Sequence, residues 1–349
     1  MTSLRFLLSA LVFALALPLA LQAAEYEAAS FQSVANDSQE FQLLQAFHTA
    51  DRRAINHLGL IAQQDERGYR VLAVLDGFPA QQAGLRRGDL LLRIDGEPYH
   101  PVRSLNPQTP ANPSPPPTRE IELEYERNGN IMTAAIFPSH GNLFDAFRTA
   151  TLASAQQFSN GNKLIGYLKL WSLDRSSDGV NSFNRLLDSL SHCDGLILDV
   201  RDSYGFINAD HLDRFFSSRN SFFALEGQNT DLWQSRQTPP LSLREYGRAM
   251  VVIQNGGTRG GMELFAYQLA KLQRVTSVGE NTAGKAGQVS YNSADNSLTY
   301  HPKPEILVDG QPLEASGVVV EVHVPYPADE SLAVDPQLDA ALLALMNII

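Results

Sequence analysis

Residues 249–266 of this chain read AMVVIQNGGTRGGMELFA, and this stretch decides the fold class. The first six residues are mostly apolar, which is typical of a strand buried on both faces. A glycine-rich turn follows, and an apolar segment that opens with Met262 then predicts a helix. A buried strand that leads through a tight turn into a helix is the repeating unit of α/β domains.

The same alternation extends over the rest of the second half of the chain. Further strands are predicted at 163–170, 195–200 and 275–278, and helices at 179–191, 262–272 and 336–346. We therefore expect one α/β domain over residues 139–349. Cys193, the sole cysteine of the chain, precedes a predicted strand and is expected to be a core residue.

Residues 57–138 show a different pattern, in which short predicted strands alternate with tight turns, as in an antiparallel sheet. Strands are predicted at 69–75 and 90–94, and Asn128-Gly129 is typical of a hairpin turn between two more strands. Residues 106–117 are rich in proline and are expected to form a loop rather than a recognition motif. Ahead of this region lies a predicted helical segment, 24–56, with its helix from Gln39 to Asn56.

The first 23 residues predict a secretory signal peptide. Arg5 provides a short positive start, residues 6–20 are apolar, and Ala23-Ala24 offer a cleavage point. An uncleaved anchor is the alternative. No other stretch is long and apolar enough to span a membrane. With a single cysteine the mature protein forms no internal disulfide, so we expect a bacterial periplasmic or secreted protein.

The overall charge argues against nucleic acid as a partner. The formal net charge is −11 at pH 7, whereas nucleic-acid-binding domains carry a basic surface. The histidines show no metal-ligand spacing, and the glycine-rich turn lacks the lysine of a phosphate-binding loop. We therefore expect no metal and no cofactor.

Two sets of motifs resemble known families. Leu58-Gly59-Leu60, PAQQAGL at 79–85 and GDLLLRIDG at 88–96 together resemble a PDZ domain of the bacterial protease type. Ile165–Leu170, Gly195–Arg201 and Gly279–Lys285 then resemble, in order, the motifs of the carboxyl-terminal processing (tail-specific) protease family. The resemblance implies an α/β protease core, a spiral of the crotonase/ClpP kind, with an inserted PDZ β-sandwich or barrel domain on its N-terminal side.

The protease resemblance implies a Ser/Lys dyad, and the serine is missing. Lys285 matches the general base, which would lose its proton in an apolar pocket and activate the nucleophile. The nucleophile position falls on Gly260, which has no side chain. Backbone N–H groups of Gly205 and Gly261 would hold the oxyanion, and the family glutamine is shifted to Gln288.

Other readings of these residues stay open. Thr258 or Ser203 could supply a substitute nucleophile, and Lys285 could be a surface lysine in a turn. Glu263 matches a family glutamate, but a carboxylate at a helix start also complements the helix dipole. Asp199 and Arg201 could form a site or a local ion pair.

The prediction for function is a member of this family with a degenerate peptidase site. It would bind polypeptide C-termini or unfolded periplasmic proteins, with backbone N–H groups around Leu58-Gly59 holding the terminal carboxylate. The alternatives are an active, lysine-dependent endopeptidase and a scaffold without a peptide cleft. If Lys285 is buried, Gly260→Ser would restore cleavage. The oligomeric state stays open.

Overall fold

The computed structural model describes residues 32–50, 52–107, 114–219, 245–303, 306–308, 311–314, 316–329 and 332–349. The predicted signal peptide and the centre of the proline-rich loop lie outside these residues. Among the helices of the described ranges, none is long and apolar enough to cross a membrane.

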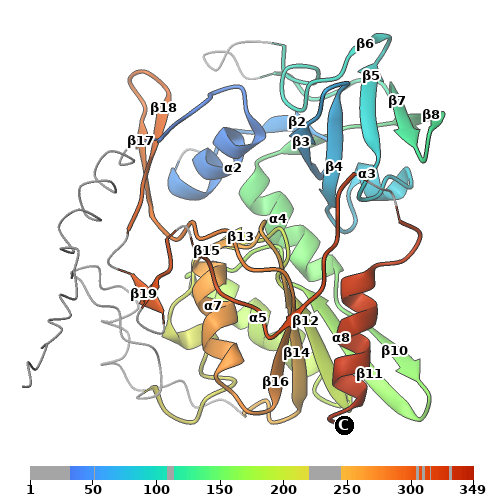
Figure 1. The fold of residues 1–349 in the computed structure, drawn as a ribbon. Coiled ribbons are helices and arrows are strands. Elements are labelled where there is room, and N and C mark those ends of the chain that lie inside the picture. The colour runs from blue at the N-terminus through green and yellow to red at the C-terminus, as the bar shows by residue number, and fades with distance from the viewer. Residues whose placement is uncertain are drawn as a thin grey trace, which may run out of the picture.

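A six-stranded sheet lies at the centre of the α/β core (Figure 1). Its strands, in their order across the sheet, are β10 (Gln156–Asn160), β11 (Lys163–Lys169), β12 (Gly195–Asp199), β14 (Ala249–Gln254), β16 (Val275–Gly279) and β21 (Val322–His323). β10 is antiparallel to β11, and the other neighbours pair in parallel. Because the spatial order follows the chain order, the chain winds in one direction, as in a spiral.

Helices cover both faces of this sheet. α5 (Ser177–Ser189) and α7 (Gly261–Ala270) pack on one face, and α8 (Pro336–Met346) packs on the other (Figure 1). Successive strand residues point to opposite faces. Leu196 and Leu198 therefore belong to the α5 and α7 side, whereas Ile197 contacts the α8 side. This double burial explains the continuous apolar runs in the sequence.

A separate antiparallel sheet occupies the region where the sequence predicts the PDZ domain. Its strands are β3 (Leu60–Gln64), β4 (Tyr69–Val74), β5 (Leu90–Ile94), β7 (Ile121–Arg127) and β8 (Asn130–Ile136), with β6 (Glu97–Pro98) paired to β5 and the short helix α3 (Pro79–Gln82). The sheet has its own hydrophobic core. Asn128 and Gly129 both have positive φ angles in the predicted hairpin turn. The PDZ assignment stays a prediction.

The N-terminal helix is shorter than predicted. α2 runs from Gln39 to His48, after Ser38, whose hydroxyl caps it by accepting a hydrogen bond from the Phe41 N–H. Residues Ile55–His57 instead form β2, which pairs with β9 (Ser139–Gly141). Asn56 also donates side-chain hydrogen bonds to the carbonyls of Leu105 and Pro115, so tertiary contacts override helical propensity there.

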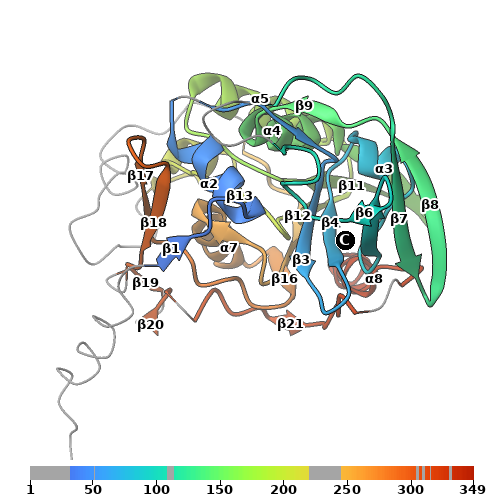
Figure 2. The same cartoon turned by 90° about the horizontal axis from the view of Figure 1, so that it is seen from above.

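α2 lies between the two sheets and a β-hairpin, as both views show (Figures 1 and 2). The hairpin is made of β17 (Gln288–Asn292) and β18 (Ser297–His301), and β1 (Gln32–Val34) pairs with β18. α2 buries its apolar side against α4 (Leu143–Ala153) and this hairpin. The remaining short elements are η1 (Ala209–His211), β13 (Tyr204–Gly205), β15 (Arg259–Gly260), β19 (Leu307–Val308) and β20 (Gln311–Pro312).

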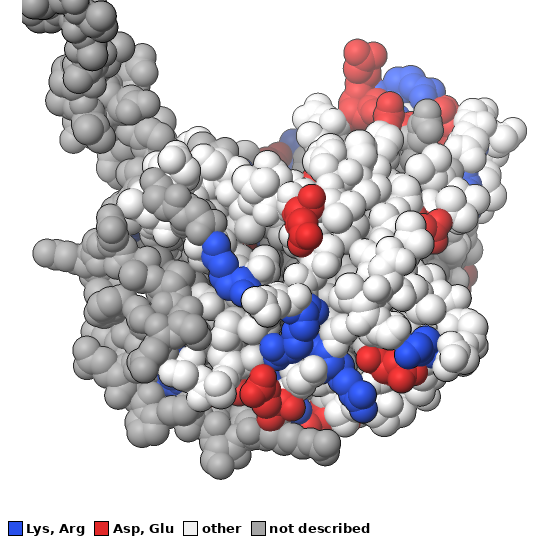
Figure 3. Space-filling model, turned by 60° about the horizontal axis from the view of Figure 1, so that its bottom comes forward, with Lys and Arg blue, Asp and Glu red and all other residues white. Residues whose placement is uncertain are grey.

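Charged side chains of both signs are interspersed on one face of the molecule. Figure 3 shows short groups of basic side chains next to acidic ones, with most of the visible described surface uncharged. A nucleic-acid-binding face would instead carry a continuous basic patch.

Candidate functional site

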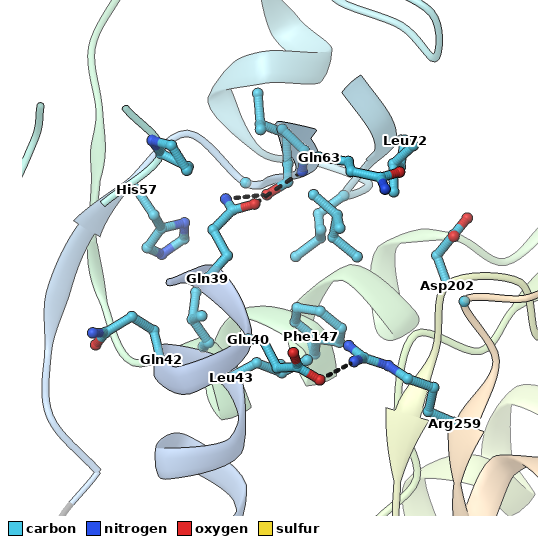
Figure 4. Close-up of a pocket in the computed structure, with 18 of the residues that line it drawn as sticks. Gln39, Glu40, Gln42, Leu43, His57, Gln63, Leu72, Phe147, Asp202 and Arg259 are labelled. Atoms are coloured by element: carbon cyan, nitrogen blue, oxygen red, sulfur yellow. Dashed lines mark hydrogen bonds and ion pairs between the residues drawn. The ribbon is translucent and has the colours of Figure 1, made fainter. Parts of the chain in front are cut away.

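A cavity of about 440 Å³ lies where α2, the antiparallel sheet and the α/β core meet (Figure 4). Gly59 and Leu60, two of the residues predicted to bind peptide, line it from one side. Arg259 and Lys285 line it from the core. The structure therefore brings the predicted peptide-binding loop and the predicted catalytic lysine to one cavity. The side chain of Leu58 is instead buried in the core of the antiparallel sheet.

Gly260 adopts a backbone conformation that only glycine takes easily. It has φ 67° and ψ −138°, at the junction of β15 and α7, and its N–H donates to the Lys285 carbonyl at 3.0 Å. A Cβ added here would lie 3.3 Å from the Gly205 carbonyl oxygen and 3.3 Å from Cε2 of Tyr204. Both the backbone and the crowding favour glycine at the expected nucleophile position.

Lys285 does not lie in the apolar pocket that a neutral base needs. Its side chain is 44% exposed, and its Nζ is 3.7 Å from Oε1 of Glu40. Nη1 of Arg259 lies 2.8 Å from the same carboxylate oxygen. Glu40, on the first turn of α2, thus sits between two cations at the edge of the cavity. The surroundings match the alternative of a lysine in a surface turn.

The two substitute nucleophiles are both inaccessible. Thr258 and Ser203 are fully buried, and both hydroxyls donate to the Val200 carbonyl, at 2.8 and 2.5 Å. Thr258 also accepts a hydrogen bond from the Asn255 N–H. These contacts shape the turns after β12 and β14. The structure therefore argues against either residue as a nucleophile.

The predicted oxyanion donors are packed against each other. β13 pairs in parallel with β15, which places Gly205 opposite Gly260. A Cβ on Gly261 would lie 2.9 Å from the Gly205 carbonyl oxygen and 2.8 Å from the Ile207 nitrogen. A side chain at position 261 therefore has no room between these segments. Gln288, the shifted family glutamine, is exposed at the start of β17.

Aromatic residues pack next to the Gly205 segment. The ring of Phe206 packs on His48, with centroids 5.0 Å apart, and on Phe47 and Tyr204. Arg175 lies over the same ring. Phe206 thus belongs to an aromatic cluster built with α2, directly after Gly205.

Comparison with known proteins finds a family match within the α/β core. Residues 164–324 match the model described as peptidase family S41. The matched residues lie in the α/β core, which is thus similar to this family. A carboxyl-terminal-processing protease of Synechocystis sp. is 27% identical over 224 residues, 62% of this chain and 49% of that protein. The carboxy-terminal processing protease CtpA of Bacillus subtilis is 22% identical over 293 residues, 81% of this chain and 58% of that protein.

The chain thus spans about half the length of these curated relatives. A solved structure from Bacteroides fragilis, assigned to the S41 proteases, shares the fold with a TM-score of 0.55 at 16% identity. That match covers 98% of this chain and 93% of the other. All three core motifs of the sequence analysis lie within the matched residues 164–324, so the match agrees with the resemblance drawn from them.

Glu263 has a role in the α/β core that its place in the sequence does not show. Its carboxylate is buried and accepts three hydrogen bonds, from the Thr282 hydroxyl at 2.6 Å and the N–H groups of Gly284 at 2.7 Å and Lys285 at 2.8 Å. The carboxylate thereby ties the 282–285 segment to the start of α7. The sequence carried one signal for these hydrogen bonds, since Glu263 is the sole acidic residue in the otherwise mostly apolar segment that forms α7.

The same carboxyl group predicts a pH dependence of stability. Burial raises the pKa of Glu263 to about 7, against the lowering effect of its three hydrogen bonds. Because the folded-state pKa lies above the unfolded value, the stabilisation is complete below pH about 4.5 and is lost as the pH rises through 7. We expect Glu263→Gln to remove this change, of about 3 kcal/mol, from the free energy of unfolding. Urea titrations at pH 5 and 8 would test it, and equal pH slopes in both proteins would contradict it.

His57 is a cavity residue that sequence reasoning missed. It is buried, and its Nδ1 has no hydrogen-bond partner among the described residues. Burial, with His140 nearby, lowers the pKa of His57 to about 4, so its ring is neutral at pH 7.

Asp199 and Arg201 form a local ion pair within a larger network. Nη2 of Arg201 lies 2.5 Å from Oδ2 of Asp199, and Nζ of Lys169 lies 3.0 Å from Oδ1. Tyr167 donates its hydroxyl to Asp199, and Arg201 also contacts Asp335 at 2.7 Å. Because both oxygens of the buried carboxylate are satisfied within the protein, the network supports the structural alternative.

Proposed function

We propose that this protein binds polypeptide C-termini or extended segments in the cavity beside α2 and that its peptidase site is degenerate. The observation that carries the proposal is Gly260, which stands at the nucleophile position in a glycine conformation. The half-exposed Lys285 and the packed oxyanion segments support it. The cavity itself opposes a scaffold without a peptide cleft.

The antiparallel sheet supplies the means of binding. β3 is an outer strand of this sheet, so its backbone groups can pair with an added peptide strand. The Gly59–Leu60 loop lies at the start of that strand and lines the cavity. We assign the sheet as a PDZ domain whose N–H groups at Leu58 to Leu60 receive the terminal carboxylate. Because residues 1–23 predict a signal peptide, we propose that this binding takes place in the periplasm or outside the cell.

Two measurements test the proposal. A fluorescent peptide with an apolar, free C-terminus should bind at least about tenfold more tightly than its C-terminal amide, because the amide lacks the charge that the loop recognises. Fluorescence anisotropy would measure both dissociation constants. Equal affinities for the two peptides would show that the protein does not recognise the C-terminal carboxylate.

The second measurement concerns cleavage. We expect an unfolded substrate with apolar C-terminal residues to stay intact with the wild type and with Lys285→Ala, as followed by mass spectrometry. The reason is that no hydroxyl of the described site reaches the cavity near Lys285. Cleavage by the wild type that disappears in Lys285→Ala would identify a lysine-dependent endopeptidase instead.

A further inference from the structure

β3 is the edge strand of the antiparallel sheet, and the side chain of Gln39 occupies part of its unpaired edge. Gln39, the first residue of α2, donates its Nε2–H to the Leu60 carbonyl at 3.1 Å and accepts from the Ala62 N–H through Oε1 at 2.9 Å (Figure 4). These two backbone groups point away from β4, towards the position of an added strand. A peptide that extends the sheet at this edge needs the same two groups.

The Gln39 carboxamide imitates a peptide strand chemically. It offers one N–H donor and one carbonyl acceptor, which is what a ligand residue would present to β3. Both contacts have ordinary hydrogen-bond lengths. Since one side chain satisfies both backbone groups, a bound peptide and Gln39 compete for them.

Glu40, the next residue, closes the other side of the cavity. Its carboxylate lies 2.8 Å from Nη1 of Arg259 and 3.7 Å from Nζ of Lys285. Figure 4 shows Gln39 pointing from α2 to the antiparallel sheet and Glu40 pointing to the core. The first turn of α2 thus places an amide and a carboxylate, the two polar groups of a peptide C-terminus, against the cavity walls.

The body of α2 is held in place, so only these side chains need to move. Phe41, Leu44 and Phe47 are buried in the cluster formed with α4 and the β17–β18 hairpin. Gln39 and Glu40 are only partly buried. Rotation of the two side chains frees the edge of β3 without moving the helix.

We propose that Gln39 is a built-in competitor that keeps the peptide-binding edge of β3 occupied until a polypeptide C-terminus displaces it. The inference rests on the proposed function, because it concerns the same cavity and the same ligand. Two neutral hydrogen bonds must be broken before the peptide can form its own, and this lowers the apparent affinity. Removing the carboxamide should therefore strengthen peptide binding about tenfold.

The test compares Gln39→Ala with the wild type and with Gln82→Ala. Gln82 serves as the control because its side chain also bonds a backbone carbonyl, that of Gly77, but lies on α3 and outside the cavity lining. The probe is the fluorescent peptide with a free, apolar C-terminus. We expect a dissociation constant about tenfold lower for Gln39→Ala and an unchanged value for Gln82→Ala.

Hydrogen exchange reports on the same edge without a ligand. In Gln39→Ala the Ala62 amide loses its acceptor and should exchange faster than in the wild type, and bound peptide should restore its protection. Equal or weaker peptide binding by Gln39→Ala would overturn the inference and leave the proposed function standing. Failure of all three proteins to bind the peptide would overturn the proposed function and this inference with it.

Discussion

Replacing Asp199 with asparagine should lower the free energy of unfolding by about 3–5 kcal/mol at pH 7, because the change removes the counter-charge of buried Lys169 and leaves buried Arg201 with only the partly exposed Asp335. Lys169 and Arg201 are both nearly fully buried and both contact this carboxylate. Solvent therefore cannot replace the lost charge. Chemical denaturation of the two proteins would measure the difference.

Asp37→Asn provides the matched control. Asp37 also pairs with an arginine, Arg103, at 3.0 Å, but both side chains are exposed. Exposed pairs of this kind contribute about 0–1 kcal/mol, so we expect little change. Similar losses of unfolding free energy in the two variants would show that burial does not account for the effect of Asp199→Asn.

Acid should weaken the wild type through the same group. Burial alone raises the pKa of Asp199, but Arg201 and Lys169 outweigh this effect and hold the pKa below its ordinary value. The stabilisation is therefore present above the ordinary pKa of about 4 and is lost as the pH falls below it. This part of the acid sensitivity should be absent in Asp199→Asn.

Gly260→Ser should lower stability by about 1–3 kcal/mol and create no peptidase activity. The serine would have to adopt a positive φ that costs a non-glycine residue energy, and its Cβ would crowd Gly205 and Tyr204. Restored cleavage required a buried Lys285, and the lysine is half-exposed instead. Thermal unfolding and mass spectrometry of an unfolded substrate would measure both effects.

A second glycine separates the two causes of the loss. Gly96 also has a positive φ, of 84°, but a Cβ there would meet nothing within 4 Å. Gly96→Ser thus reports the cost of a positive φ without crowding, and the difference between the variants reports crowding together with the ψ of −138° at Gly260. Cleavage of the substrate by Gly260→Ser would contradict the view that the oxyanion geometry has been lost.

The fold was largely predictable because its strands are buried on both faces. The predicted bounds of β14 and α8 agree with the structure, since each element carries an uninterrupted local signal. The length of α2 was wrong, because the pairing of Ile55–His57 with β9 depends on residues far along the chain.

The site was less predictable, for a related physical reason. Motif positions located Gly260 and Lys285, but the sequence carries no information on what surrounds a side chain. The exposure of Lys285 follows from contacts between α2 and the core. The hydrogen bonds of Glu263 and Gln39 likewise join segments that are distant in sequence.

The position of α8 has a consequence for how the chain matures. Ile165, Ile197 and Val251 on one face of the central sheet are covered only when Leu345 and its neighbours pack on them. Domains assemble progressively as the chain leaves the ribosome. This face therefore stays uncovered until residues 336–346 have emerged from the ribosome.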